Sequence, residues 1–121
     1  MTAARPHAQH APRGAPEKAV VRDITRFLHA LGYVVNDMSQ PRASMMPVGL
    51  PDLYAMHRGY PGHPGHAIWV EAKAARGRVS EAQQAWHAAA RAAGQTVLVA
   101  RSAADLIPLL RSLGAPLTPD P

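Results

Sequence analysis

Residues 49–83 of the chain read GLPDLYAMHRGYPGHPGHAIWVEAKAARGRVSEAQ, and this stretch decides the fold. It contains two apolar runs joined by a turn rich in glycine, proline and histidine. Side chains alternate between the two faces of a strand, so Glu71 and Lys73 point the same way. If the runs pair as antiparallel strands, Asp52 at the start of one lies near Glu71 and Lys73 towards the end of the other. Two carboxylates beside one ammonium suit a hard divalent cation held by oxygen ligands.

The composition of the chain limits the possible classes of protein. A length of 121 residues predicts one domain, and 47% apolar residues suffice for one core. The absence of cysteine excludes disulfides, thiolate zinc sites and a cysteine nucleophile. The sequence contains neither a membrane-spanning stretch nor a signal peptide, so a soluble cytoplasmic protein is expected. The net charge of +5 favours an anionic partner such as nucleic acid.

The two ends of the chain differ in composition from its middle. Residues 1–15 are rich in Ala, Pro, Arg and His without an apolar period, which predicts a disordered basic tail. His7 and His10 in this tail are interpreted as solvated side chains rather than metal ligands. Residues 16–113 form the predicted domain, and residues 114–121 are a proline-rich end.

The domain opens with a predicted amphipathic helix over residues 16–31. Its apolar residues recur at the spacing of one helical face, and they are Val20, Ile24, Phe27, Leu28 and Leu31. Pro16 suits the first helical position and Gly32 is a good stop. Glu17 lies in the first turn, where its charge complements the helix N-terminus. A second possibility is that Glu17 is a third carboxylate directed at a metal.

Three strands are predicted after this helix, at 33–35, 52–57 and 67–73. Residues 36–48 are predicted to be a loop in which Arg42 is placed to reach a phosphate. Met45 and Met46 in the same loop are interpreted as packing residues. His57, His63 and His66 could suggest a histidine metal site. The favoured interpretation is against it, because the two histidines in the turn, His63 and His66, are expected to be exposed and none of the three has a two-histidine helical spacing.

The remaining segments complete a helix, strand, helix order. Ser80 and Gln83 form a capping box that opens a helix ending at Gly94. The apolar run 96–100 is typical of a strand covered on both faces. Ser102 and Asp105 predict the start of a last helix that runs to Leu113, with Pro108 kinking its interior. The helix between the third and fourth strands permits a parallel crossover, which predicts an α/β fold with a mixed sheet.

These motifs together resemble the PD-(D/E)XK nuclease superfamily, and within it the VRR-NUC family of small phage and bacterial nucleases. The resemblance covers about residues 16–107 and rests on G-x-P-D at 49–52, E-x-K at 71–73 and S-x-x-Q-x-x-W at 80–86. Glu17 matches the acidic residue on the first helix of the family. The resemblance implies a restriction-endonuclease-like αβββαβ core with a four-stranded mixed sheet, flanking helices and an additional C-terminal helix.

The resemblance also implies hydrolysis of phosphodiester bonds in DNA with Mg²⁺ or Mn²⁺. The implied metal ligands are Glu17, Asp52, Glu71 and the backbone carbonyl of Ala72. Lys73 would orient the attacking water or stabilise negative charge, and Gln83 would position Lys73 or the phosphate. The basic residues expected to contact phosphates are Arg42, Arg76 and Arg78.

Standalone members of the family resemble Holliday-junction resolvases, which implies a homodimer that cuts branched or junction DNA. Apolar residues of the last helix are expected to supply spare surface for the dimer, and they are Leu106, Ile107, Leu109, Leu110 and Leu113. Two alternatives stay open. One is a non-catalytic nucleic-acid-binding module that retains the nuclease fold, and the other is a small structural or interaction protein.

Overall fold

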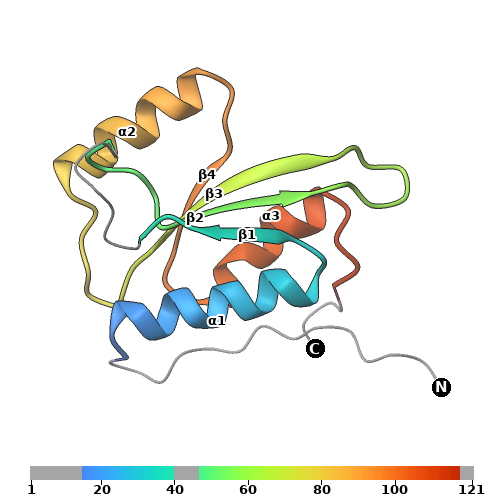
Figure 1. Ribbon diagram of the computed structural model, residues 1–121, viewed down its shortest axis with the longest axis horizontal. Helices are drawn as coiled ribbons and strands as arrows, with labels where there is room; N and C mark the ends of the chain where they lie inside the picture. The colour runs from blue at the N-terminus through green and yellow to red at the C-terminus, as the bar shows by residue number, and fades with distance from the viewer. Residues whose placement is uncertain (1–14, 40–46, 118–121) are drawn as a thin grey trace.

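A mixed four-stranded sheet in the order β1-β2-β3-β4 lies at the centre of the computed structural model, which describes residues 15–39 and 47–117 (Figure 1). The pairs β1–β2 and β2–β3 are antiparallel, and β3–β4 is parallel. This confirms the predicted α/β fold class and the crossover between the last two strands. The elements in chain order are α1 (Glu17–Ala30), β1 (Val34–Asp37), β2 (Leu53–His57), β3 (His66–Ala72), α2 (Glu81–Ala92), β4 (Val97–Ala100), the 3-10 helix η1 (Ala103–Leu106) and α3 (Ile107–Ser112).

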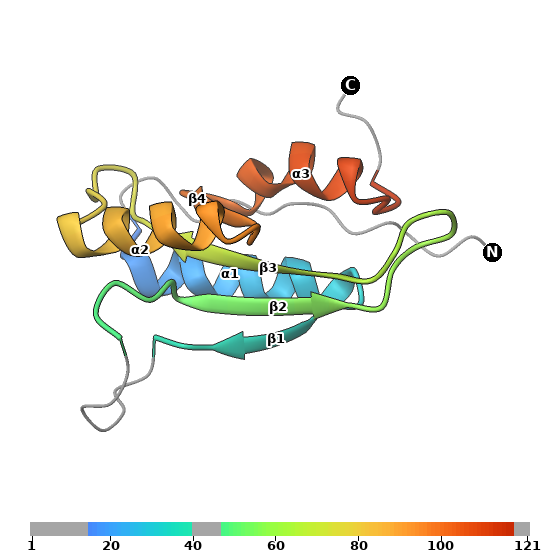
Figure 2. The ribbon, with the colours of Figure 1, turned by 90° about the horizontal axis from the view of Figure 1, so that it is seen from above.

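The hydrophobic core lies between one face of the sheet and the helices α1, η1 and α3. The apolar face of α1 packs there with the alternating inward residues of β2 and β3, because strand side chains repeat every second residue. The fully buried members include Ile24, Leu28, Leu53, Ile68, Val70, Leu106 and Leu110. Helix α2 lies on the other face of the sheet, as Figures 1 and 2 show.

The outer face of the sheet is formed by the residues between these inward positions. Tyr54 on β2 and Trp69 on β3 are register partners with ring centroids 4.4 Å apart. Trp86 of α2 packs edge-to-face against Trp69, with the two ring centroids 4.9 Å apart. Helix α2 therefore packs on the sheet through an aromatic contact. Val34 and Met56, which are also register partners, remain exposed on the neighbouring strands.

Strand β1 extends further than the sequence predicted. The composition of residues 36–48 predicts a loop, but Asn36 and Asp37 pair with β2 as the end of an edge strand. Pro16 caps α1 from outside the helix rather than filling its first position. The apolar run of β4 is also an edge strand, and Leu98 and Val99 in it are only half-buried, so the predicted cover on both faces is incomplete.

The C-terminal helix differs most from the prediction. A 3-10 helix leads into a short α-helix, so Pro108 lies in the first turn of α3, where no backbone hydrogen bond is lost. Ser102 makes no side-chain cap, because Asp105 accepts a hydrogen bond from the backbone N–H of Arg101 instead.

The expectation of spare apolar surface on this last helix is wrong. Leu106 and Leu110 are fully buried in the core, and Ile107, Leu109 and Leu113 pack against it. The large apolar side chains that are exposed within the described residues are Val34, Val48 and Met56 instead.

Several predictions lie outside the described residues. They concern the basic tail up to residue 14, the last four residues of the proline-rich end, and the side chains His7, His10, Arg42, Met45 and Met46. Within the described ranges, none of the helices has both the length and the apolarity to cross a bilayer.

Candidate active site

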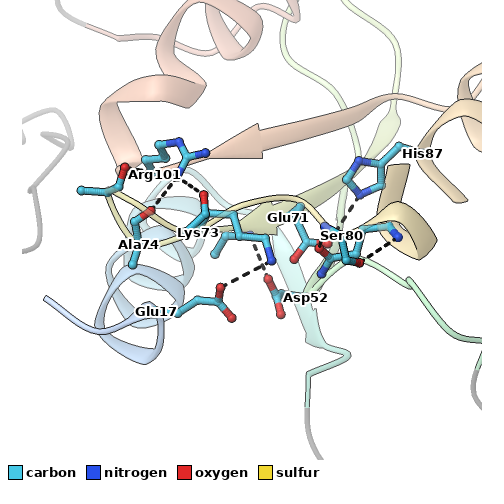
Figure 3. Close-up of polar contacts among 12 residues, drawn as sticks. Glu17, Asp52, Glu71, Lys73, Ala74, Ser80, His87 and Arg101 are labelled. Carbon is cyan, nitrogen blue, oxygen red and sulfur yellow. Dashed lines mark hydrogen bonds and ion pairs between the residues drawn. The ribbon is translucent and has the colours of Figure 1, made fainter. Parts of the chain in front are cut away.

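The pairing of β2 with β3 determines which polar side chains meet at one end of the sheet. Leu53 is the register partner of Val70, so Asp52 lies beside the residues that follow Val70. One carboxylate oxygen of Asp52, Oδ2, accepts a hydrogen bond of 2.8 Å from the backbone N–H of Ala72. The structure therefore brings Asp52, Glu71 and Lys73 together at this end of the sheet (Figure 3).

The chain before Asp52 is held against the first turn of α2. Gly49 has φ +91°, and a Cβ atom at this position would lie 2.3 Å from the carbonyl oxygen of Ala82. Only glycine permits both this backbone conformation and such a close approach. The G-x-P-D segment and the start of α2 therefore fix each other, and Asp52 follows directly from this contact.

Glu71 is the most unusual ionisable group of the site, since it is only 1% exposed. Burial raises the pKa of Glu71 to about 9, with hydrogen bonding to Asp52 and the negative charge of Asp52 as further causes. Lys73 lowers this pKa and the charge of Glu17 raises it, both to a smaller extent. At neutral pH the Glu71 carboxyl is therefore protonated in the protein without a bound cation.

His87 of α2 lies against Glu71, and the sequence reasoning missed it. Its Nε2 atom is 3.4 Å from Oε1 of Glu71, and within the described residues both atoms are buried without a hydrogen-bond partner. Burial lowers the pKa of His87, and the charges of Arg91 and Lys73 act in the same direction. A neutral imidazole can still donate one N–H to a carboxylate. The available signal was its spacing four residues after Gln83, on the same helical face.

Lys73 follows β3 and turns towards the N-terminus of α1. Its Nζ atom lies 3.7 Å from Oε1 of Glu17, whose side chain is 46% exposed. Lys73 itself is only 8% exposed. The ammonium is therefore held next to the carboxylates by a partner on a separate element, and Glu17 reaches the site through this ion pair.

Gln83 serves as a cap in this structure. Its Oε1 accepts from the backbone N–H of Ser80 at 2.9 Å, and Oγ of Ser80 accepts from the backbone N–H of Gln83 at 3.2 Å. The predicted capping box is confirmed. The cap fixes the first turn of α2, on the helix that carries His87.

The loop after Lys73 is held by Arg101, a second residue that the sequence reasoning missed. Its Nη1 donates to the carbonyl oxygens of Ala74 and Gly77 at 2.6 and 2.7 Å (Figure 3). Backbone carbonyls have no sequence signature, so no motif reveals this contact. Arg76 and Arg78 lie exposed in or next to the same loop, beside the site.

The carboxylate oxygens at this end of the sheet are of the type that binds a divalent cation, but they are not already arranged around one point. In the described part of the chain, no three Asp, Glu or His side chains are close enough together to hold a metal ion. Oε1 of Glu71 is nevertheless a buried acceptor without a hydrogen bond. A cation there would satisfy this oxygen and, because it favours the ionised carboxylate, would oppose the effect of burial on the pKa of Glu71.

Two histidines of the β2–β3 hairpin, His57 and His66, have structural partners, whereas His63 is exposed. The backbone N–H of Gly59 donates to Nδ1 of His57, so Nε2 carries the proton and donates to the carbonyl of Leu31 at 3.1 Å. Nε2 of His66 lies 2.5 Å from the hydroxyl of Tyr33. These contacts fasten the hairpin to the end of α1, at the opposite end of β2 and β3 from Asp52 and Glu71.

Comparison with known proteins agrees with this fold. The sequence matches no family model, and a search of curated proteins gives no match. A solved structure described as "VRR_NUC domain" is similar to this chain with a TM-score of 0.61 and 24% sequence identity, over 80% of this chain and 97% of the other. The chain therefore has the fold of a VRR_NUC domain, as its sequence motifs predicted.

Proposed function

We propose, on the basis of the VRR_NUC fold and the residues gathered at one end of its sheet, that the protein is a metal-dependent endonuclease that hydrolyses phosphodiester bonds in DNA. The observation that carries the proposal is the convergence of Asp52, Glu71 and Lys73, with Asp52 bonded to the backbone next to Glu71. Carboxyl groups with strongly raised pKa values cluster at functional sites, and the buried Glu71 is such a group.

The residues that would hold Mg²⁺ or Mn²⁺ are Asp52, Glu71, the backbone carbonyl of Ala72 and, directly or through water, Glu17. When bound, such an ion supplies charge neutralisation at a phosphate oxygen and a water of lowered pKa. Before binding, Glu71 must lose the proton that its burial retains. A neutral His87 would then donate its Nε2 proton to Oε1 of Glu71 and hold that carboxylate in one orientation.

Lys73 is the residue suited to the charge that develops on the phosphate during the reaction. Its ammonium is nearly buried, so its attraction to an anion is stronger than in water. Glu17 holds the ammonium in place through the 3.7 Å ion pair. Because the Glu17 side chain is half-exposed, water screens its charge, and the ammonium can still attract a phosphate. Gln83 supports the site by capping the helix that carries His87.

The preferred DNA is proposed to be branched, and the acting species a homodimer. Symmetric cutting of a junction requires two sites related by a two-fold axis. The exposed pair Val34 and Met56 on the outer sheet face supports self-association there. Arg76 and Arg78, exposed beside the site, are proposed to contact phosphates.

A second candidate function is a nucleic-acid-binding module without turnover. The observation in its favour is that, in the described residues, Glu17 pairs with Lys73 and no three acidic or histidine side chains form a metal cluster. Such a module would bind DNA but would not cleave it, whichever divalent metal ion is present.

The test is a cleavage assay with four-way junction, flap and duplex DNA in Mg²⁺, Mn²⁺ or EDTA. The isosteric variants Asp52→Asn and Glu71→Gln keep the size of each side chain and remove its charge. Asp23→Asn on α1 is the matched control. We expect cleavage by the wild type and Asp23→Asn in metal only, and none by the two site variants. Full cleavage activity in either site variant would contradict the proposed nuclease site. DNA binding without cleavage by the wild type would favour the nucleic-acid-binding module.

A further inference from the structure

A groove with one basic wall lies between α1 and the end of the edge strand β1. Its volume is about 610 Å³, and its lining residues are Lys18, Val21, Arg22, Thr25, Arg26, Asp37 and Ser39. Five of these belong to α1, and the other two come from the end of β1 and the segment that follows it. The groove is thus formed by two elements, and it is not part of the candidate active site.

The charges on the helical wall form one stripe. Lys18, Arg22 and Arg26 recur every four residues, which places them on one side of a helix. All three are exposed, and none of them takes part in the ion pairs Glu17–Lys73 and Glu71–His87. Asp37 on the opposite wall offsets one charge, so the groove keeps a positive excess. Several exposed cations that face one groove are expected to attract an anion from solution.

The stripe also leads to the candidate active site. Lys18 follows Glu17 in the first turn of α1, and Glu17 is the residue that pairs with Lys73. Figure 1 shows α1 running along β1, with the start of the helix at the end of the sheet where β3 finishes. From Lys18 to Arg26 the helix rises about 12 Å. Charges along one strand of a duplex are about 3.4 Å apart on the axis, so this length matches about three nucleotides.

We propose that this groove binds the phosphate backbone of the DNA substrate on one side of the cut, with Lys18, Arg22 and Arg26 each contacting a phosphate. The inference rests on the proposed function for the identity of the anion. It assigns a DNA path along α1, separate from Arg76 and Arg78 in the loop after β3. Contacts of this kind position the strand without reading its sequence.

Binding can be measured without cleavage, in EDTA, by the fluorescence anisotropy of a labelled duplex at several salt concentrations. Each phosphate contact contributes about 0.9 to the slope of log affinity against log salt. The triple variant Lys18→Ala, Arg22→Ala, Arg26→Ala is therefore expected to flatten the slope by about 2 to 3. Arg58→Ala, which removes an exposed arginine in the hairpin at the far end of the sheet, is the control and should leave the slope unchanged.

A second measurement uses the absence of cysteine from the chain. The thiol of Ser39→Cys lies in the groove, whereas that of Ser112→Cys lies at the end of α3. Bound duplex is expected to slow maleimide labelling of the first and not of the second. Equal protection of both thiols, or an unchanged salt slope in the triple variant, would overturn the groove as the DNA path.

These outcomes are independent of catalysis. If the wild type cleaves DNA while the triple variant binds with the same salt slope, the groove proposal fails and the nuclease proposal stands. If the wild type never cleaves but the triple variant loses its salt slope, the groove proposal stands and the nuclease proposal fails.

Discussion

Nε2 of His87 lies 3.4 Å from Oε1 of Glu71, and within the described residues both atoms are buried without another hydrogen-bond partner. This pair joins α2 to the end of β3. Partners of this kind orient a metal-binding carboxylate and fix the tautomer of the imidazole.

Replacing His87 with alanine should weaken Mg²⁺ binding by about 10- to 100-fold, because Glu71 loses the donor that orients it. His87→Gln keeps an N–H donor on a side chain of similar reach and should restore part of the affinity. Isothermal titration calorimetry measures both variants. Unchanged Mg²⁺ affinity in His87→Ala would indicate that His87 does not orient Glu71 for the metal.

Metal affinity should rise as pH increases from 6 to 9. Glu71 holds a proton up to about pH 9 in the metal-free protein, so Mg²⁺ must displace that proton to bind. Calorimetry in buffers of different ionisation enthalpy counts the protons released. Binding without proton release at pH 7 would contradict the raised pKa of Glu71.

The same group predicts how the stability of the metal-free protein depends on pH. The folded pKa of Glu71 lies above its ordinary value of 4.5, so its contribution is complete below that value and is lost as pH rises towards 9. His87 has a lowered pKa and contributes the opposite slope near its ordinary value of 6.5. Urea unfolding of the wild type and Glu71→Gln at several pH values isolates the contribution of Glu71 to the free energy of unfolding. If this free energy depends on pH in the same way in both proteins, Glu71 makes no such contribution.

Lys73→Ala should lower turnover by about 10²- to 10³-fold, which is the usual effect of removing one group that stabilises charge in the transition state. Mg²⁺ affinity should stay the same or improve slightly, because the ammonium repels the cation. Single-turnover cleavage and calorimetry give the two values. Lost metal binding with normal turnover would assign Lys73 a different role.

Gly49→Ala should lower the melting temperature much more than Gly62→Ala. Both glycines have positive φ, at +91° and +77°, so both substitutions strain the backbone by about 1 kcal/mol or more. A Cβ at Gly49 also meets Ala82 at 2.3 Å, whereas one at Gly62 has no atom within 4 Å. The difference between the two melting temperatures measures how much the close contact of Gly49 with α2 contributes to stability. Equal shifts in the two variants would show that this contact contributes nothing.

The protein should be a dimer at micromolar concentration that associates through Val34 and Met56. Met56→Glu would place a charge in that apolar patch and should shift the mass measured by light scattering towards the monomer. Val48→Glu is the control, since Val48 is exposed outside the strands. A wild type that stays monomeric with and without DNA would exclude the dimer and the argument for junction cutting.

Local rules were sufficient for much of the fold. The capping box of Ser80 and Gln83 depends on residues within one turn, and strand alternation placed Glu71 and Asp52 correctly. The last helix was predicted incorrectly because its split at Leu106 depends on packing in the core, which a periodic pattern does not show.

The missed site residues had no comparable local signal. His87 is one histidine on an alanine-rich helix, and it becomes informative only when that helix is placed against β3. Arg101 donates hydrogen bonds to the backbone carbonyl oxygens of Ala74 and Gly77. Every residue type has a backbone carbonyl, so the sequence at these positions does not reveal the contact. Both depend on tertiary arrangement, whereas Asp52 and the E-x-K pair are visible in the strand pattern.

Glu17, Asp52, Glu71 and His87 belong to four different parts of the chain: α1, the start of β2, the end of β3 and α2. A two-stranded hairpin is marginally stable by itself, and the β2–β3 hairpin would carry only Asp52 and Glu71. Copies that lack the α1 or α2 contacts would therefore not bring the four side chains together. The topology thus makes the proposed hydrolysis dependent on the folded state of the whole domain.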